Sequence, residues 1–149
     1  MTNPFDDRAR SWDDDSRRRR MTAGIFDALC RRIPLQPDWN ILDYGAGTGL
    51  LTLALAPRIR HATAVDSSPG MLAVLAEKAR SAGVANIEIR PGDFQTDPPP
   101  PGPFHLVVSA MTLHHVRDVE AVLNTFFRLL APAGRLAVAD LEEEDGTFH

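Results

Sequence analysis

Cysteine is almost missing from this chain, which has 149 residues and a single cysteine, Cys30. One cysteine excludes an intrachain disulfide framework and a zinc site built from several cysteines. No segment reaches the ~18 apolar residues that a transmembrane helix needs, and the start, MTNPFDDRAR, lacks the apolar stretch of a signal peptide. From these absences we predict a cytoplasmic protein with no membrane partner.

An excess of basic charge is missing as well. The chain has 16 lysine and arginine residues against 20 aspartate and glutamate residues, which gives a net charge of -4. This balance gives no general attraction to polyanions, so we predict no nucleic acid partner. The arginine run Arg17–Arg20 could be a phosphate-binding patch, but we interpret it as a solvated helix face because one short run is a small footprint.

What the chain does contain is a regular alternation of apolar segments. Short apolar runs predict strands at 40–44, 61–66, 86–90, 104–109 and 135–141, and helical spacing predicts helices at 16–33, from the glycine turn to about 56, at 68–82 and at 118–130. Strands that alternate with helices indicate parallel βαβ units. The predicted fold is α/β, with a mostly parallel, doubly wound sheet of five strands. The domain is predicted at 16–149, after a flexible segment at 1–15 that is poorly ordered until a ligand or the domain body organises it.

The first predicted strand leads into a glycine-rich turn, ILDYGAGTGLL at 41–51. In an open α/β sheet, ligands bind beyond the carboxyl ends of the strands, and glycine lets the backbone approach a ligand closely. The turn is not a dinucleotide fingerprint, because Leu50 stands where the last glycine of G-x-G-x-x-G belongs. It is not a P-loop either, because no Gly-Lys-Ser/Thr follows. Taken alone, it could be a tight turn without a ligand.

An aspartate follows or ends each of the first three predicted strands: Asp43, Asp66 and Asp93. Asp43 places negative charge beside the glycine turn, which repels a pyrophosphate and attracts a positive centre. Asp66 can accept hydrogen bonds from ribose hydroxyls, and Asp93 can accept one from the amino group of adenine. Each could be a cap or turn residue, but together they point to a nucleoside with a cation and no phosphate. S-adenosylmethionine has this chemistry.

The chain resembles class I S-adenosylmethionine-dependent methyltransferases, in particular the group that acts on small molecules. The resemblance rests on LDYGAGTG, AVDSSPGML, PGDF, FHLVVSAMTLHHV and GRLAVADLE, which cover about residues 40–141. It implies a three-layer Rossmann-like fold, S-adenosylmethionine as cofactor with S-adenosylhomocysteine as product, and a small-molecule O, N or C acceptor. It also implies the residues that surround the cofactor, which are Asp43, Gly45, Ala46, Gly47, Asp66, Ser67, Met71, Gly92, Asp93, Phe94, Ser109 and Ala110.

The acceptor side of the expected site has fewer candidates. Trp12, Met111 and His115 are expected near the substrate. Methyl transfer from a sulfonium needs an in-line nucleophile and the exclusion of water, and it needs a general base only where the acceptor loses a proton. His114 is the candidate for such a base, and the alternative is that both histidines are ordinary loop residues. No metal site is expected, because no suitably spaced third ligand accompanies them.

Two other functions stay open from the sequence. The domain could be a non-catalytic module that binds S-adenosylmethionine or a partner. It could also be an NAD-dependent oxidoreductase, although Leu50 argues against this.

The end of the chain departs from the resemblance. The family sheet has seven strands, and no sixth or seventh strand can be recognised after residue 141. The apolar fifth strand would then have an unprotected edge. We therefore expect either a homo-oligomer in which another copy covers this edge, or a trimmed piece of a longer protein.

Overall fold

The computed structural model describes residues 2–142. Within these residues, five parallel strands form one sheet in the order β3-β2-β1-β4-β5. The predicted α/β fold with a parallel, doubly wound sheet is therefore confirmed. The strands are β1 (Asn40–Tyr44), β2 (His61–Asp66), β3 (Ile87–Pro91), β4 (Phe104–Ala110) and β5 (Leu130–Ala139).

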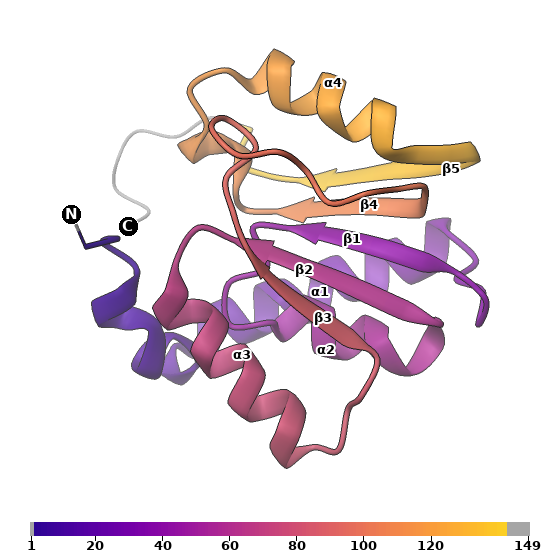
Figure 1. Cartoon of the computed structure of the whole chain (residues 1–149). Helices are drawn as coiled ribbons and strands as arrows, with labels where there is room; N and C mark the ends of the chain where they lie inside the picture. The colour runs from indigo at the N-terminus through magenta and orange to yellow at the C-terminus, as the bar shows by residue number, and fades with distance from the viewer. Residues whose placement is uncertain (1, 143–149) are drawn as a thin grey trace.

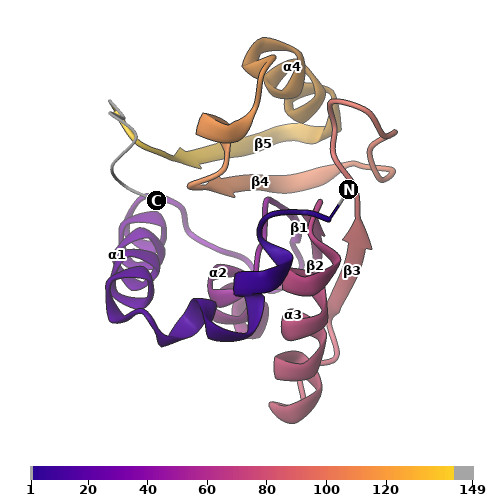
Figure 2. The ribbon, with the colours of Figure 1, turned by 90° about the vertical axis from the view of Figure 1, so that its left-hand side faces the viewer.

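Helices cover both faces of the sheet and make three layers (Figure 1). One face carries α1 (Ser16–Arg32), α2 (Leu50–Leu55) and α3 (Pro69–Ser81), and the opposite face carries α4 (Val119–Leu129), as the rotated view in Figure 2 shows. Short 3-10 helices lie at η1 (Asp6–Asp14), η2 (Ala56–Arg58) and η3 (Leu113–His115). Within the described part of the chain, no helix is long and apolar enough to cross a bilayer.

The central strands β1, β2 and β4 are buried on both faces because both faces are covered there. Successive side chains of a strand point to opposite faces, so neighbours in sequence belong to different cores. Ile41 packs with Leu55 and Leu106 beneath α1 and α2, whereas Leu42 packs with Val107 and Phe126 beneath α4. This arrangement holds the carboxyl ends of the strands in fixed positions along one edge of the sheet.

The direction of winding reverses between β1 and β4. From β1 the chain passes through α2 to β2 on one side, and from β4 it passes through α4 to β5 on the other. Crevices at such a reversal are where open α/β sheets bind ligands. The register places Asp43 beside Ala64 of β2 and Val108 of β4, so the end of β1 lies in the middle of this crevice.

The fifth strand differs from its prediction. It begins at Leu130 instead of residue 135, because Phe104 pairs with Leu130 and Leu106 pairs with Arg135 across a bulge. The sequence pattern places the residues between these two pairs in a turn after the preceding helix, since they include Pro132 and Gly134. β5 is the edge strand of the sheet within residues 2–142, and Val138 is 44% exposed. That another copy covers this edge stays a prediction.

The N-terminal segment is organised by the domain body. We expected residues 1–15 to be poorly ordered without such help. In the structure, η1 packs against α3, and Figure 2 shows the segment running across α2 and α3. These contacts include hydrogen bonds between residues far apart in sequence, such as Asp6 with Ser68 and Asp13 with Thr48, and hydrophobic periodicity gives no sign of them.

Candidate functional site

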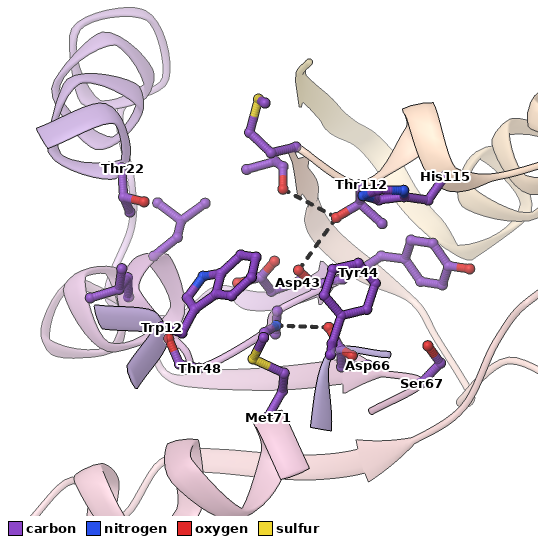
Figure 3. A pocket seen from close by; sticks show the side chains of 18 of the residues that line it. Trp12, Thr22, Asp43, Tyr44, Thr48, Asp66, Ser67, Met71, Thr112 and His115 are labelled. Carbon is purple, nitrogen blue, oxygen red and sulfur yellow. Dashed lines mark hydrogen bonds between the residues drawn. The ribbon is translucent and has the colours of Figure 1, made fainter. Parts of the chain in front are cut away.

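A cavity of about 240 Å³ opens at the carboxyl ends of the strands where the winding reverses. Its walls come from the glycine turn after β1, the ends of β2 and β4, the first half of α1, and η1. Figure 3 shows Met71 approaching from α3 and Thr22 from α1, with Thr112 and His115 on the other side of the glycine turn. Most residues predicted from the sequence line this cavity: Trp12, Asp43, Gly45, Ala46, Gly47, Asp66, Ser67, Met71, Gly92, Asp93, Ala110, Met111 and His115.

Three predicted residues do not line it. The ring of Phe94 packs against that of Tyr44 in a tilted arrangement, with 4.5 Å between centroids, and joins the apolar core beneath α4. Ser109 is 1% exposed, and its hydroxyl donates to the backbone carbonyl of Tyr44 at 3.0 Å. His114 is turned toward Asp140 at the end of β5. Each of these side chains contacts another part of the protein instead of the cavity, and the sequence pattern gives no sign of that contact.

Asp43 is a buried carboxylate in the wall of the cavity. It is 2% exposed, and its Oδ2 accepts a hydrogen bond of 2.6 Å from the hydroxyl of Thr52 on α2. Burial and the nearby charge of Asp66 raise the pKa of Asp43 to about 6, although the bond from Thr52 acts in the opposite direction. The charged form of this buried carboxylate is therefore unfavourable by itself, and a positively charged ligand in the cavity would stabilise it.

Asp66 at the end of β2 fixes the glycine turn. Its Oδ2 accepts from the backbone N–H of Gly47 at 2.8 Å, and its Oδ1 accepts from that of Ser68 at 2.9 Å. Burial nevertheless raises its pKa. A carboxylate offers about four acceptor positions, so two such bonds leave capacity for a ligand with hydroxyl groups.

The glycines of the turn have different surroundings. A Cβ on Gly45 would lie 2.0 Å from Oγ1 of Thr112, and one on Gly49 would lie 2.1 Å from Cδ1 of Leu75, so these two glycines permit close packing within the protein. Gly47 has a φ of +57° and lines the cavity, and a Cβ added there would meet nothing within 4 Å. The open space beside the turn is therefore at Gly47.

A third carboxylate closes the cavity beyond β3. Asp93 accepts from the hydroxyl of Tyr44 at 3.2 Å and from the backbone N–H of Gln95 at 2.9 Å. Burial and the charge of Asp93 raise the pKa of Tyr44, which keeps its hydroxyl protonated as a donor. Tyr44 and Gln95 both line the cavity and were not predicted from the sequence.

Asp140 holds the segment that follows β4. Its Oδ2 accepts from the backbone N–H groups of Leu113 at 2.7 Å and His114 at 3.3 Å, and its Oδ1 lies 2.6 Å from Nδ1 of His114. Burial opposes ionisation of Asp140, but the N–H of Leu141 and the contacts with His114 and Leu113 hold its pKa below the ordinary value. Because an ionised carboxylate only accepts, Nδ1 of His114 carries the proton. The ring of His115, which does line the cavity, lies 4.0 Å from that of His114.

One cationic side chain in the wall was not identified as a site residue. Arg18 belongs to the arginine run on α1, and its guanidinium lies 3.7 Å from the ring centroid of Trp12. Among the described residues that line the cavity, it is the only arginine or lysine. It differs from its neighbours Arg17, Arg19 and Arg20 in that they are exposed, whereas Arg18 is partly buried on the inner side of α1. Within residues 2–142, no group of three histidine, cysteine or acidic side chains could hold a metal ion.

Comparison with known proteins gives the family. Residues 41–134 match the family model described as a methyltransferase domain. The chain belongs to this methyltransferase family. The matched residues run from β1 into β5 and include the glycine turn, Asp43 and Asp66, so the family match and the cavity involve the same part of the chain.

Individual relatives agree with this assignment. An uncharacterized methyltransferase of Schizosaccharomyces pombe is 35% identical over 117 residues, 74% of this chain and 41% of that protein. A demethylmenaquinone methyltransferase of Listeria welshimeri is 33% identical over 112 residues, 73% of this chain and 48% of that protein. The chain therefore spans about half the length of these curated relatives.

A solved structure shares the fold of this methyltransferase domain. The DhpI-SAM-HEP complex superposes with a TM-score of 0.76 at 26% identity, over 95% of this chain and 64% of that one. The high coverage of this chain shows that the helices and strands around the cavity have counterparts in that structure.

Proposed function

We propose that this domain binds S-adenosylmethionine in the cavity and transfers its methyl group to a small molecule. The observation that carries the proposal is the pair of carboxylates, Asp43 and Asp66, at neighbouring strand ends beside a glycine turn. The family match and the similar structure with SAM in its name support it. A dinucleotide would bring a pyrophosphate to this turn, where the two carboxylates would repel it.

The residues present fit this cofactor. The space beside Gly47 is open, so the turn can receive a ligand without moving. The donor set matches the parts of the molecule: carboxylates for hydroxyl and ammonium groups, apolar Met71 for a flat base, and one cation for a carboxylate. When bound, S-adenosylmethionine supplies a methyl group that is already activated on a sulfonium.

Each protein group then has one task. Asp66 accepts from the ribose hydroxyls, Met71 packs on adenine, and Asp43 balances the positive charge of the methionine portion. Arg18 binds the carboxylate of that portion, since it is the cation that the described lining provides. Asp93 and Gln95 contact the edge of the adenine. Trp12 and Phe5 cover the remaining side and exclude water.

The acceptor approaches from the segment after β4. Met111, Thr112, His115 and Val116 form this wall, which is apolar apart from one hydroxyl and one imidazole. Where the acceptor loses a proton, we propose that the general base is provided by the pair of histidines, His114 and His115. His114 has its Nδ1 proton bound to Asp140, so in the neutral ring the basic atom is Nε2. His115 is the member of the pair that faces the cavity.

Asp140→Asn tests the histidine pair. The single carbonyl oxygen of asparagine is expected to stay with the backbone donors of Leu113 and His114, so its NH₂ faces Nδ1 and reverses the tautomer of His114. We expect kcat for a hydroxyl acceptor to fall about tenfold while the affinity for S-adenosylhomocysteine stays within twofold. ¹⁵N–¹H spectra of the imidazoles measure the tautomer directly. Glu120→Gln on the exposed side of α4 is the control, and an unchanged kcat in Asp140→Asn would remove the pair from the mechanism.

The experiment for the function itself has two stages. Calorimetry with S-adenosylmethionine, S-adenosylhomocysteine and NAD should show binding of the first two and none of NAD. Methyl-labelled S-adenosylmethionine is then incubated with phenols, quinols, amines and carbon acids, and transfer of label to one class supports the enzyme. Binding without transfer to any acceptor favours the alternative, a non-catalytic S-adenosylmethionine-binding module. Binding of NAD alone would favour an NAD-dependent oxidoreductase.

A further inference from the structure

The N-terminal segment contains the same kind of residue pair twice, seven positions apart. Phe5 precedes Asp6, and Trp12 precedes Asp13. In each pair the aromatic residue lines the cavity, whereas the aspartate bonds to the body of the domain. Each aspartate is thus attached to a fixed element, and each carries an aromatic ring of the cavity wall beside it.

Asp6 binds the beginning of α3. Its Oδ1 accepts from the hydroxyl of Ser68 at 2.5 Å and from the backbone N–H of Gly70 at 2.8 Å. The bond from Ser68, followed by the one from Gly70, lowers the pKa of Asp6, so it is charged at neutral pH. A Cβ on Gly70 would lie 2.9 Å from the Cα of Asp6, so the close contact of η1 with α3 depends on the missing side chain.

Asp13 joins the glycine turn to the last turn of α3. Its Oδ1 accepts from the hydroxyl of Thr48 at 2.6 Å, and its Oδ2 lies 2.6 Å from Nζ of Lys78. The same Nζ donates to the backbone carbonyl of Thr48 at 2.8 Å. Asp13, Thr48 and Lys78 therefore form a closed set of contacts at the edge of the turn proposed to hold the cofactor.

The two aromatic rings connect this segment to both walls of the cavity. Their centroids are 5.9 Å apart in an edge-to-face arrangement. Phe5 also contacts the ring of His115 at 5.3 Å, and Trp12 lies under Arg18 of α1. The rings thus extend from α1 to η3 across the open side of the cavity, and Figure 3 shows the Trp12 side chain in front of the glycine turn between these elements.

We propose that Asp6 and Asp13 are positioning residues that hold Phe5 and Trp12 as a removable wall over the cofactor. This inference rests on the proposed function. A cofactor with its ribose at Asp66 and its base at Met71 lies directly beside the elements to which the two aspartates bind, so exchange requires these contacts to break. Once they have broken, η1 can swing away without disturbing the sheet, because its main contacts are with α3, α1 and the glycine turn.

The test uses S-adenosylhomocysteine as the probe. Preformed complexes with tritiated ligand are chased with unlabelled ligand, and the release rate is compared among Asp6→Ala, Asp13→Ala and the double variant. We expect release to become about tenfold faster in each single variant and faster still in the double one. Asp7→Ala and Asp14→Ala are matched controls, since these neighbouring aspartates are exposed, and they should release at the original rate.

Two further variants separate positioning from a general loss of structure. Asp6→Asn keeps an acceptor for the N–H of Gly70 and should restore much of the slow release. Gly70→Ala favours the helix at α3 but removes the room for Asp6, so it should speed release about tenfold while the Tm stays the same or rises. Release at the original rate in Asp6→Ala, Asp13→Ala and Gly70→Ala would overturn the inference. If the unmodified protein fails to bind S-adenosylhomocysteine, the proposed function fails instead.

Discussion

Asp66→Asn is expected to weaken the binding of S-adenosylhomocysteine by about 100-fold or more. Two effects combine. The charged acceptor for the ribose hydroxyls is lost, and hydrogen bonds to charged groups are each worth about 1.5–3 kcal/mol. The NH₂ of asparagine must also face a backbone N–H, either that of Gly47 or that of Ser68, where both carboxylate oxygens now accept. The substitution therefore removes a ligand contact and disturbs the glycine turn at once.

Calorimetry at pH 7.5 measures this loss. Asp38→Asn is the control, because this exposed aspartate precedes β1 and so lies at the opposite end of the strands from the cavity. Its affinity should match that of the unmodified protein. An Asp66→Asn variant that binds within threefold of the unmodified protein would show that the ribose is held elsewhere.

Asp43→Asn is expected to change stability and binding in opposite directions. In the protein without ligand, burial of a charged Asp43 is unfavourable, and its pKa of about 6 lies above the ordinary value of 3.8. Asparagine removes that cost and keeps an acceptor for the hydroxyl of Thr52. We expect the free energy of unfolding at pH 7.5 to rise by about 1–3 kcal/mol and the Tm to rise by about 3–8 °C. Binding of S-adenosylmethionine should weaken by about 30-fold, because the charge that balances its positive groups is gone.

The dependence on pH gives a second sign to check. Because the folded protein binds the proton of Asp43 more tightly than the unfolded chain does, this group stabilises the fold below about pH 3.8, and the stabilisation is lost as pH rises through about 6. The stability advantage of Asp43→Asn should therefore be near zero at pH 4 and complete above about pH 6.5. In the unmodified protein, the affinity for S-adenosylmethionine should fall as pH drops below about 6.

Thermal unfolding from pH 4 to 8 and calorimetry over pH 5 to 8 follow both effects. A lower Tm for Asp43→Asn at pH 7.5 would mean that the buried carboxylate contributes to stability, contrary to what its raised pKa predicts. Thr52→Val serves as the matched variant, since it removes the hydrogen bond to Asp43 and should raise the cost of the charge without removing it.

The sheet could be predicted because its signals are local. β1 and β2 have the bounds expected from their apolar runs, β3 is shifted by one residue at both ends, and β4 is longer by one residue at its end. The carboxylates Asp43, Asp66 and Asp93 are expected near one another, because the carboxyl ends of parallel strands share one edge. The cavity brings all three together.

The rest of the site depends on contacts between distant polar residues. Asp6 meets Ser68 across 62 positions, Asp13 meets Lys78 across 65, and Asp140 meets His114 across 26. Single charged residues in such pairs leave no periodic pattern in the sequence. Phe94 illustrates the same limit, since it follows Asp93 directly and yet turns into the core, where Tyr44 and Phe126 provide an aromatic surface that only the fold assembles.

A crystal structure of the complex with S-adenosylhomocysteine tests the central claim most directly. We predict both ribose hydroxyls within hydrogen-bonding distance of the carboxylate of Asp66, the adenine against Met71, and the amino group of the homocysteine on the side of Asp43. The ligand's sulfur should face the wall formed by Thr112 and His115. A ligand bound outside this cavity, or a ribose that does not contact Asp66, would contradict the claim.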